Sequence, residues 1–341
     1  MLNVTPEKAL NPADDHTMRA VVHRQYGSPD LLALEEVERP TPGDDDVLVR
    51  VHAASANSGD HHVVTGRPYM IRLSPYGGVP RPRHRVLGAT MAGRVVAVGA
   101  KVTTVRPGDE VYGQARSGAF AEYLVMPAAM IARKPTNLSF EEAAAVPWAT
   151  TALQAFRAGG LKPGQKILIN GASGGVGTWA VQLAKALGAE VTAVCSTRNV
   201  AMVRGLGADE VIDYRVQDFV TGGARFDVML DLVGNRSLSD CRRVLVPGGT
   251  YVPCSGGGGD WVGPLVRIVA GLATFLFSRR RFKMFVNTPN REDLEVLTAL
   301  VEAGKARPVI ERRYGLGEVA EALAHVGAGH TQGQTILRIA S

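Results

Sequence analysis

The sequence predicts a two-domain α/β protein, in which a β-rich domain is joined to a doubly wound domain with a parallel sheet. Its length of 341 residues fits about two domains of roughly 150 residues each. Short apolar runs separated by Gly and Pro turns occupy residues 19–125, a pattern typical of a compact, partly closed β domain. From Lys166 onward, apolar strands alternate with helical patterns, and this alternation builds a parallel sheet covered by helices.

The β-rich part follows a leader at residues 1–17 that is predicted to be loosely structured. The leader has no apolar core and carries acidic residues, which argues against a secretory signal or a transit peptide. The predicted strands lie at residues 19–23, 47–54, 93–99 and 110–112. Residues 66–87 are rich in Gly and Pro and predict a long loop, which in a compact domain is often functional.

The α/β part starts near Ser139, which forms a capping-box pattern with Glu142 ahead of an Ala-rich helix. Predicted strands follow at residues 166–170, 190–195, 210–213, 226–232 and 250–253, with helices at 176–187, 201–206, 291–303 and 317–326. The last predicted strand, residues 334–339, is expected to return to the β-rich domain. The predicted domains are therefore 18–140 together with 290–341, and 141–289.

A glycine-rich turn between the strand at 166–170 and the following helix predicts a dinucleotide site. Gly171 would allow the tight bend, and Gly174 and Gly175 would let the main chain approach a pyrophosphate. Gly177 would allow close packing of the helix on the strand, and the helix N-terminus would offer free N–H groups to the phosphates. The residues predicted to bind the cofactor here are Ala172, Ser173, Gly174, Gly175, Val176 and Gly177.

The end of the next strand predicts NADPH rather than NADH. NAD-specific sites place a carboxylate at this point to accept the ribose hydroxyls, whereas this strand continues into Ser196, Thr197 and Arg198. The two hydroxyls and the guanidinium would pair with a 2′-phosphate, and arginine can do so bidentately. Tyr214, after the third strand, could add a phenolic hydroxyl on the same side.

Composition and spacing set further limits on function. The net charge is +6 with a pI of about 9.3, and the only dense basic cluster is residues 278–283 (SRRRFK), so no nucleic-acid site is expected. His61 and His62 are adjacent and cannot converge on one ion, and the first cysteine is Cys195, so no catalytic metal is expected. Scattered cysteines favour a reducing, cytoplasmic location.

With these motifs placed, the chain resembles the medium-chain dehydrogenase/reductase superfamily, in its zinc-lacking quinone oxidoreductase-like branch. The resemblance runs from Met18 to about Ile339. The motifs that carry it are highly specific when taken together, although each alone is not. Where zinc-dependent relatives carry Gly-His-Glu, this chain reads Gly88-Ala89-Thr90. The stretches that carry the resemblance are 54–60 (ASANSGD), 86–99 (VLGATMAGRVVAVG), 106–112 (RPGDEVY), 118–123 (GAFAEY), 145–155 (AVPWATTALQA) and 170–177 (NGASGGVG).

The resemblance implies a GroES-like β domain built from both ends of the chain, a Rossmann domain, and a cleft between them for nicotinamide and substrate. It further implies a homodimer that reduces quinones or the activated C=C bonds of enones with NADPH. Asn57 would lie near nicotinamide and substrate, Thr151 near the nicotinamide ring, and Val233 and Gly234 against the cofactor. Trp148 departs from the small aliphatic residue that is common there, which puts the substrate size in question.

Other interpretations stay open at this point. Tyr69 could donate a proton, as a tyrosine in a similar loop does in enoyl-thioester reductases of this superfamily, or it could pack over the cleft. Asp60 is expected to structure its loop. Residues 261–285 predict an amphipathic helix that lines the cleft, joins two copies or contacts a membrane surface. The alternatives to a quinone or enone reductase are an enoyl-thioester reductase and a nucleotide-binding scaffold with little turnover.

Overall fold

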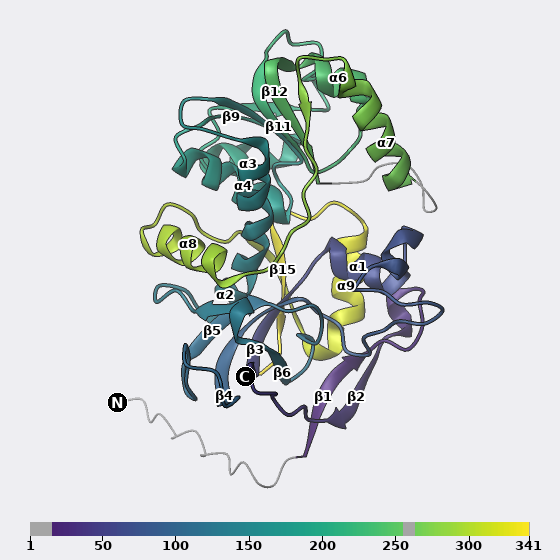
Figure 1. The fold of residues 1–341 in the computed structure, drawn as a ribbon, viewed down its shortest axis with the longest axis vertical. Coiled ribbons are helices and arrows are strands. Elements are labelled where there is room, and N and C mark those ends of the chain that lie inside the picture. The colour runs from purple at the N-terminus through teal and green to yellow at the C-terminus, as the bar shows by residue number, and fades with distance from the viewer. Residues whose placement is uncertain (1–15, 255–262, 341) are drawn as a thin grey trace.

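The computed structural model describes residues 16–254 and 263–340 and has two domains stacked along the long axis (Figure 1). The predicted leader lies almost entirely outside the described residues, and its last residue, Thr17, already belongs to the first strand. In Figure 1 the β-rich domain lies below and the α/β domain lies above.

The β-rich domain is organised around one long strand, β3 (Asp46–Ala56). Its sheet has the order β14-β15-β3-β4-β5-β7, with β6 also paired to β3, while β1 and β2 form a separate antiparallel ribbon. Strands β3 and β4 supply a core of buried small and β-branched side chains. The strands are β1 (Thr17–Val22), β2 (Ala33–Glu38), β4 (Thr90–Val98), β5 (Glu110–Gln114), β6 (Tyr123–Pro127), β7 (Ile131–Arg133), β14 (Ile310–Gly315) and β15 (Gln334–Arg338).

The predicted return of the last strand is confirmed, because β15 pairs antiparallel with β3, with Ile336 opposite Ser55. Strand β14, which pairs with β15 in parallel, was not predicted. Its sequence, IERRYG, is polar and partly exposed because it lies at the sheet edge, and it therefore lacks the apolar run by which buried strands are recognised.

The α/β domain contains a wholly parallel sheet in the order β10-β9-β8-β11-β12-β13. This is the doubly wound order 3-2-1-4-5-6, so the predicted Rossmann arrangement is confirmed. Strand β13 was not predicted, because two residues at a sheet edge give no periodic signal. The strands are β8 (Lys166–Asn170), β9 (Glu190–Cys195), β10 (Glu210–Asp213), β11 (Phe226–Asp231), β12 (Leu245–Pro253) and β13 (Arg281–Phe282).

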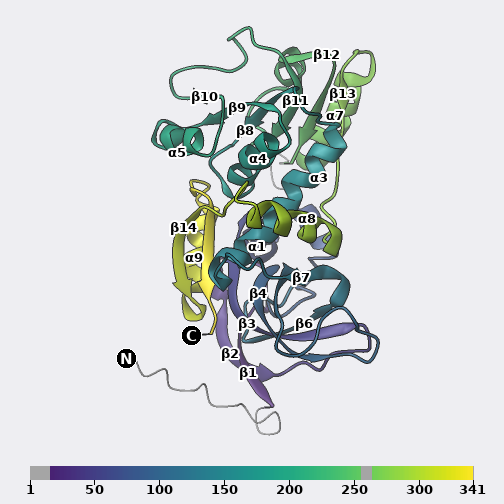
Figure 2. The ribbon, with the colours of Figure 1, turned by 90° about the vertical axis from the view of Figure 1, so that its left-hand side faces the viewer.

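Helices cover both faces of this sheet and join the two domains. The capping box of Ser139 and Glu142 is confirmed at the start of α2, which packs on β3 and β4 of the β-rich domain. Figure 2 shows α8 lying between the two domains. The helices are α1 (Ser58–Thr65), α2 (Phe140–Ala145), α3 (Ala149–Gly159), α4 (Gly175–Ala186), α5 (Val200–Gly205), α6 (Leu238–Arg243), α7 (Gly263–Leu276), α8 (Arg291–Glu302) and α9 (Val319–Gly327).

Polar contacts on α8 hold the domains together. The hydroxyl of Tyr112, on β5, donates to the Leu294 carbonyl at 2.6 Å, and the buried Asp293 pairs with Arg157 of α3. Helix α8 therefore contacts β5 of the β-rich domain and α3 of the α/β domain. The boundaries between the two domains stay predictions.

Candidate functional site

A cavity of about 910 Å³ lies at the carboxyl ends of β8, β9, β10 and β11. Ligands of doubly wound sheets bind at this edge, where the strand order reverses between β8 and β11. The β-rich domain closes the cavity through Ser58 on α1 and residues after α9. Its main lining residues are Ser58, Asn170, Gly171, Ser173, Gly174, Gly175, Val176, Gly177, Ser196, Thr197, Arg198, Tyr214, Arg215, Val233, Asn235, Cys254, Val326, Gly329, His330 and Thr331.

The glycine turn has the geometry that the sequence predicts for close main-chain approach. Gly171 adopts a φ of +90°, which other residues rarely reach. A Cβ on Gly177 would lie 2.2 Å from the Gly171 carbonyl oxygen, so only glycine permits this packing of α4 on β8. At Gly174, by contrast, a Cβ would meet only the Gly171 oxygen at 3.8 Å, so its open side faces the cavity.

The start of α4 fits a pyrophosphate. Gly174 is its N-cap residue and has no side chain to satisfy the first N–H groups of the helix. These donors and the positive end of the helix dipole form an anion site. The donor set and the glycine cradle therefore fit a dinucleotide cofactor.

The predicted 2′-phosphate residues lie together at the β9 end of the cavity. Ser196 is buried, whereas Thr197 and Arg198 are exposed, and Tyr214 follows β10 beside them. Arg198 donates from Nη2 to the His330 carbonyl, which ties this end to the β-rich domain.

Asp213 is a carboxylate at the same end that sequence reasoning did not consider. It stands opposite Cys195 in the β9–β10 pairing, and its Oδ1 accepts the Arg215 N–H at 3.0 Å. The Thr197 hydroxyl also donates a hydrogen bond to the Asp213 carboxylate, and this bond lowers the pKa of Asp213. The carboxylate is therefore ionised and already holds hydrogen bonds from Thr197 and Arg215.

Arg215 and His330 are lining residues that the sequence analysis missed. Arg215 follows β10 directly, and the rule that carboxyl ends of parallel strands meet at one edge could have found it. His330 belongs to the loop after α9, which reaches the glycine turn from the other domain. There Gly333 donates to the Ser173 carbonyl at 2.9 Å, a contact without any local signal in the sequence.

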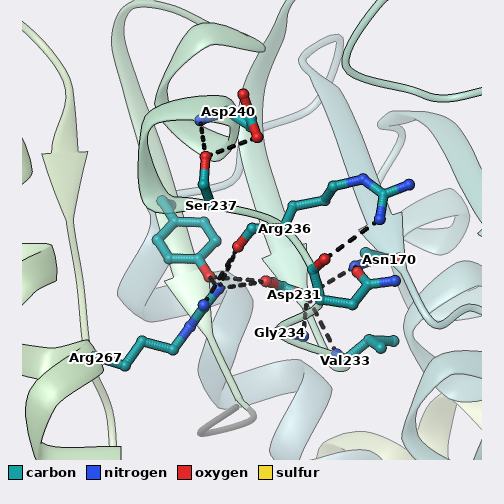
Figure 3. A network of polar contacts seen from close by, with 10 residues as sticks. Asn170, Asp231, Val233, Gly234, Arg236, Ser237, Asp240 and Arg267 are labelled. Atoms are coloured by element: carbon teal, nitrogen blue, oxygen red, sulfur yellow. Dashed lines mark hydrogen bonds and ion pairs between the residues drawn. The ribbon is translucent and has the colours of Figure 1, made fainter. Parts of the chain in front are cut away.

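A buried carboxylate fixes the loop that follows β11 (Figure 3). Asp231 is fully buried, and its Oδ1 accepts the Gly234 N–H at 2.9 Å and the Val233 N–H at 3.2 Å. The same oxygen accepts the Asn170 side-chain amide at 2.9 Å. One carboxylate therefore joins the ends of β8 and β11, on the two sides of the strand-order reversal.

The second oxygen of Asp231 faces α7. Tyr251 donates its hydroxyl to Oδ2 at 2.7 Å, and Arg267 reaches the same atom with Nη2 at 3.3 Å. Burial, and then the charge of Asp231, raise the pKa of Tyr251, so the hydroxyl stays a donor. Arg267 offsets the charge of Asp231, and the pair links α7 to the wall of the cavity.

The two cysteine thiols that line the cavity, Cys195 and Cys254, are not ionised near pH 7. Burial raises the pKa of Cys195 to about 11 and that of Cys254 to about 12. Both therefore remain neutral thiols near pH 7, and neither supplies a thiolate nucleophile.

The opposite wall includes Ser58, which follows Asn57, the N-cap residue of α1. The Oδ1 of Asn57 accepts the Gly59 N–H at 2.6 Å, and its Nδ2 donates to Asp60. Asp60 completes a capping box by accepting the Asn57 N–H at 3.2 Å, which is the structural role expected of it. Burial raises the pKa of Asp60 to about 8, although these N–H donors oppose the shift.

Several predicted site residues do not line the cavity. Ala172 and Gly234 lie behind its wall, where Ala172 is fully buried and Gly234 donates to Asp231. Thr151 accepts a hydrogen bond from Asn287 at 3.1 Å. Asn57 is adjacent to the lining residue Ser58, and the Tyr69 ring lies 4.8 Å from the Arg72 guanidinium. Their roles therefore stay predictions.

Trp148 lies close to the start of α1. A Cβ on Gly59 would be 3.9 Å from Trp148 Cη2, so the indole borders the segment that carries Asn57 and Ser58. The indole nitrogen is buried without a hydrogen-bond partner in the described part of the chain. The effect of this ring on substrate size stays a prediction.

The segment Gly88-Ala89-Thr90, where the resemblance implies the ligands of zinc-dependent relatives, contains no His, Cys, Asp or Glu. Ala89 and Thr90 are buried in β4 and the turn before it. Within residues 16–254 and 263–340, His, Cys, Asp and Glu side chains form no group of three or more that could hold a metal. Among these same residues, no helix is both long and apolar enough to cross a membrane.

Comparison with protein families gives two matches in this chain. The alcohol dehydrogenase GroES-like domain family matches residues 43–136, and the zinc-binding dehydrogenase family matches residues 206–337. The first match covers most of the β-rich domain, which confirms its GroES-like character.

Similar proteins extend over nearly the whole chain. A 2-methylene-furan-3-one reductase of Solanum lycopersicum is 33% identical over 94% of this chain and 79% of its own. A chloroplastic quinone oxidoreductase of Triphysaria versicolor is 31% identical over 94% of this chain and 98% of its own. The solved quinone oxidoreductase of Coxiella burnetii superposes with a TM-score of 0.83 at 29% identity, covering 95% of this chain and all of that one.

Proposed function

Since the chain belongs to the medium-chain dehydrogenase/reductase superfamily, in its quinone oxidoreductase-like branch, we propose that it is a zinc-independent, NADPH-dependent reductase of quinones or enones. The observation that carries this proposal is the cleft. A glycine turn and a helix N-terminus stand at the strand-order reversal, and arginines lie at the far end. The names of the relatives support quinones and activated C=C bonds as acceptors.

The charge at the β9 end supports NADPH over NADH. Arg198 and Arg215 both line the cavity there, together with the hydroxyls of Ser196 and Thr197. Asp213 would repel a 2′-phosphate, but its oxygens are turned to Thr197 and to the Arg215 amide. The guanidinium groups of Arg198 and Arg215 outnumber the single carboxylate of Asp213, which is already hydrogen-bonded within the protein. This balance of charge favours NADPH, which carries the additional 2′-phosphate.

The chain's residues would bind and orient the reactants. When bound, NADPH would supply a hydride to an electron-poor carbon of the acceptor. The first N–H groups of α4 would hold the pyrophosphate, and the loop fixed by Asp231 would support the nicotinamide end. Val233 and Trp148 would exclude water, which strengthens electrostatic interactions in the site.

The reduced acceptor develops negative charge on oxygen, and without zinc a hydrogen-bond donor must stabilise it. Asn57 is the residue we propose for this task. An amide nitrogen carries two hydrogens, and Asp60 accepts one of them. The second could donate to the acceptor oxygen.

The decisive experiment measures oxidation of NADPH and NADH by the purified protein with quinones, small enones and enoyl thioesters. We expect turnover with quinones or enones and a preference for NADPH. Binding of NADPH without turnover on any acceptor would instead identify a nucleotide-binding scaffold. Metal analysis of the same preparation should find no stoichiometric zinc, and activity that depends on zinc would overturn the proposed mechanism.

The Tyr69→Phe variant separates the proposed reductase from an enoyl-thioester reductase. If the acceptor is a quinone, we expect the turnover to change by less than about threefold, because no proton donor at that position is required. Loss of activity on an enoyl thioester, with NADPH binding intact, would assign the proton to Tyr69 and favour the other enzyme class.

Assembly and location are also proposals. The resemblance supports a homodimer, and the scattered cysteines support the cytoplasm. Sedimentation analysis of the purified protein and fractionation of its source cells would test the two statements.

A further inference from the structure

Helix α7 presents an apolar face to solvent. Its exposed side chains are spaced three or four residues apart and therefore share one side of the helix. They are Val266, Val269, Leu272 and Leu276, with exposed fractions of 57, 59, 56 and 70%, and Phe277 follows at 97%. Most exposed apolar residues occur singly, whereas these form a continuous stripe.

The other face of α7 is firmly attached to the α/β domain. Gly271 lets the helix approach Phe282 so closely that a Cβ would lie 2.3 Å from its ring. Phe275 is buried and stacks on Tyr251, with ring centroids 5.9 Å apart. The apolar stripe is therefore held on a fixed helix in the described structure.

Positive charge follows the stripe along the chain, in a segment that itself carries no acidic residue. Arg279, Arg281 and Lys283 are exposed directly after α7. No Asp or Glu occurs between Asp260 and Glu292, so the local charge is wholly basic. Apolar side chains next to unopposed basic ones are typical of helices that lie in a membrane interface.

We propose that this surface, formed by the stripe and the three basic residues and here named the α7 patch, binds the surface of an anionic lipid bilayer. Helix α7 would lie in the membrane interface, since it is too short to cross the bilayer. Arg279 and Lys283 would pair with lipid headgroups. Arg281, whose Nε and Nη2 donate to the Gly248 carbonyl at 3.2 and 2.9 Å, would add positive charge beside them. A second copy of the chain is the less suitable occupant, because a two-fold interface over this patch would bury the basic side chains of both copies, and the patch itself has no acidic residue to pair with them.

The α7 patch is also connected to the cavity. Cys254 lines the cavity before the chain continues to α7, and Arg267 of α7 contacts Asp231 behind the cavity wall. A docked α7 would thus hold the site close to a bilayer. The docking follows from the surface alone and does not depend on the proposed reaction.

Vesicle flotation of the full chain tests the proposal. We expect binding to phosphatidylcholine vesicles that contain phosphatidylglycerol, weak binding without it, and release by salt. Leu272→Gln with Leu276→Gln should lower the affinity at least about tenfold, and Arg279→Glu with Lys283→Glu should do the same. These side chains are exposed, and thermal melts of the variants check that they fold.

Matched controls carry the same changes elsewhere on the surface. Leu73→Gln removes an apolar side chain that is 81% exposed on the β-rich domain, and Lys162→Glu with Arg204→Glu reverses two exposed charges. Both controls should bind like the parent protein. Absence of binding to anionic vesicles, or equal losses in the controls, would overturn the proposal. A dimer that dissociates in Leu272→Gln with Leu276→Gln, while vesicle binding is absent, would assign the α7 patch to a second copy.

Discussion

The two walls of the cavity are built in different ways. The α/β wall is mostly main chain: the glycine turn after β8 and the loop after β11, held by the buried side chains of Asn170 and Asp231. The opposite wall consists mainly of side chains, from Ser58 of α1, Val326 of α9 and the loop after α9. Helices α1 and α9 meet where His61 packs against Gly327. The first wall is set by local conformation, whereas the second depends on packing between distant segments.

The largest effect is expected where the main-chain wall tolerates no side chain. Gly177→Ala places a Cβ 2.2 Å from a carbonyl oxygen that cannot move independently of β8. We expect a loss of about 2–4 kcal/mol in the free energy of unfolding and loss of NADPH binding, measured by denaturant melts and fluorescence titration. Gly205→Ala is the matched control, since nothing lies within 4 Å of its Cβ, and it should be neutral or stabilising.

The support behind that wall is tested by Arg267→Met. The change leaves the buried Asp231 without its cation and should lower the free energy of unfolding by about 2–3 kcal/mol. Because the loop at Val233 and Gly234 depends on Asp231, KM for NADPH should rise more than kcat falls. The control is Arg242→Met, which removes a 3.0 Å contact to the α7 carbonyl of Thr274 without touching Asp231. Equal effects of the two variants on KM would contradict a role for the Asp231 network.

The junction of the two walls is tested by Arg198→Ala. This arginine lines the cavity and bonds to the His330 carbonyl of the other domain. Loss of a charge-assisted contact should weaken NADPH binding about tenfold, or ~1.4 kcal/mol, and leave NADH binding nearly unchanged. Isothermal titration with both nucleotides measures the difference. A preference for NADH that persists in the variant would refute the assignment of NADPH.

The side-chain wall is tested by pH. The pKa of Asp60 is raised from 3.8 to about 8, so the folded protein retains a proton that the unfolded chain loses. The resulting stabilisation is complete below about pH 4 and is lost as pH rises through about 8. Asp60→Asn keeps an acceptor for the helix cap but has no proton to lose, so its stability should depend less on pH. Relative to the parent protein, the free energy of unfolding of the variant should be higher at pH 8 than at pH 5 by at least about 1 kcal/mol. Denaturant melts of the parent protein and of Asp60→Asn at the two pH values measure this difference. If stability changes with pH equally in both proteins, the raised pKa of Asp60 is contradicted.

Predictability from sequence follows the same division. Strands β8, β9 and β10 were predicted at their observed limits. Strands β8 and β9 lie inside the sheet and are continuous apolar runs, whereas β10 lies at the sheet edge and is marked by the turn at Gly207 before it. The edge strands β13 and β14 were missed, since they are short or partly exposed, and β2, β6 and β7 of the β-rich domain were missed as well. The glycine turn was predicted because its residues are consecutive. Arg215 and His330 were missed because they join the site only through sheet order and domain contact.

The sequence by itself determined the main-chain half of this protein. Glycines at fixed spacing, a strand before them and a helix after them allow one conformation, and that conformation makes an anion site. Only the tertiary structure decided what faces it. The Arg198–His330 contact spans 132 residues, and the Asp231–Arg267 pair crosses from a strand end to a helix. Such contacts depend on packing that brings distant segments together, and local sequence patterns carry no record of it.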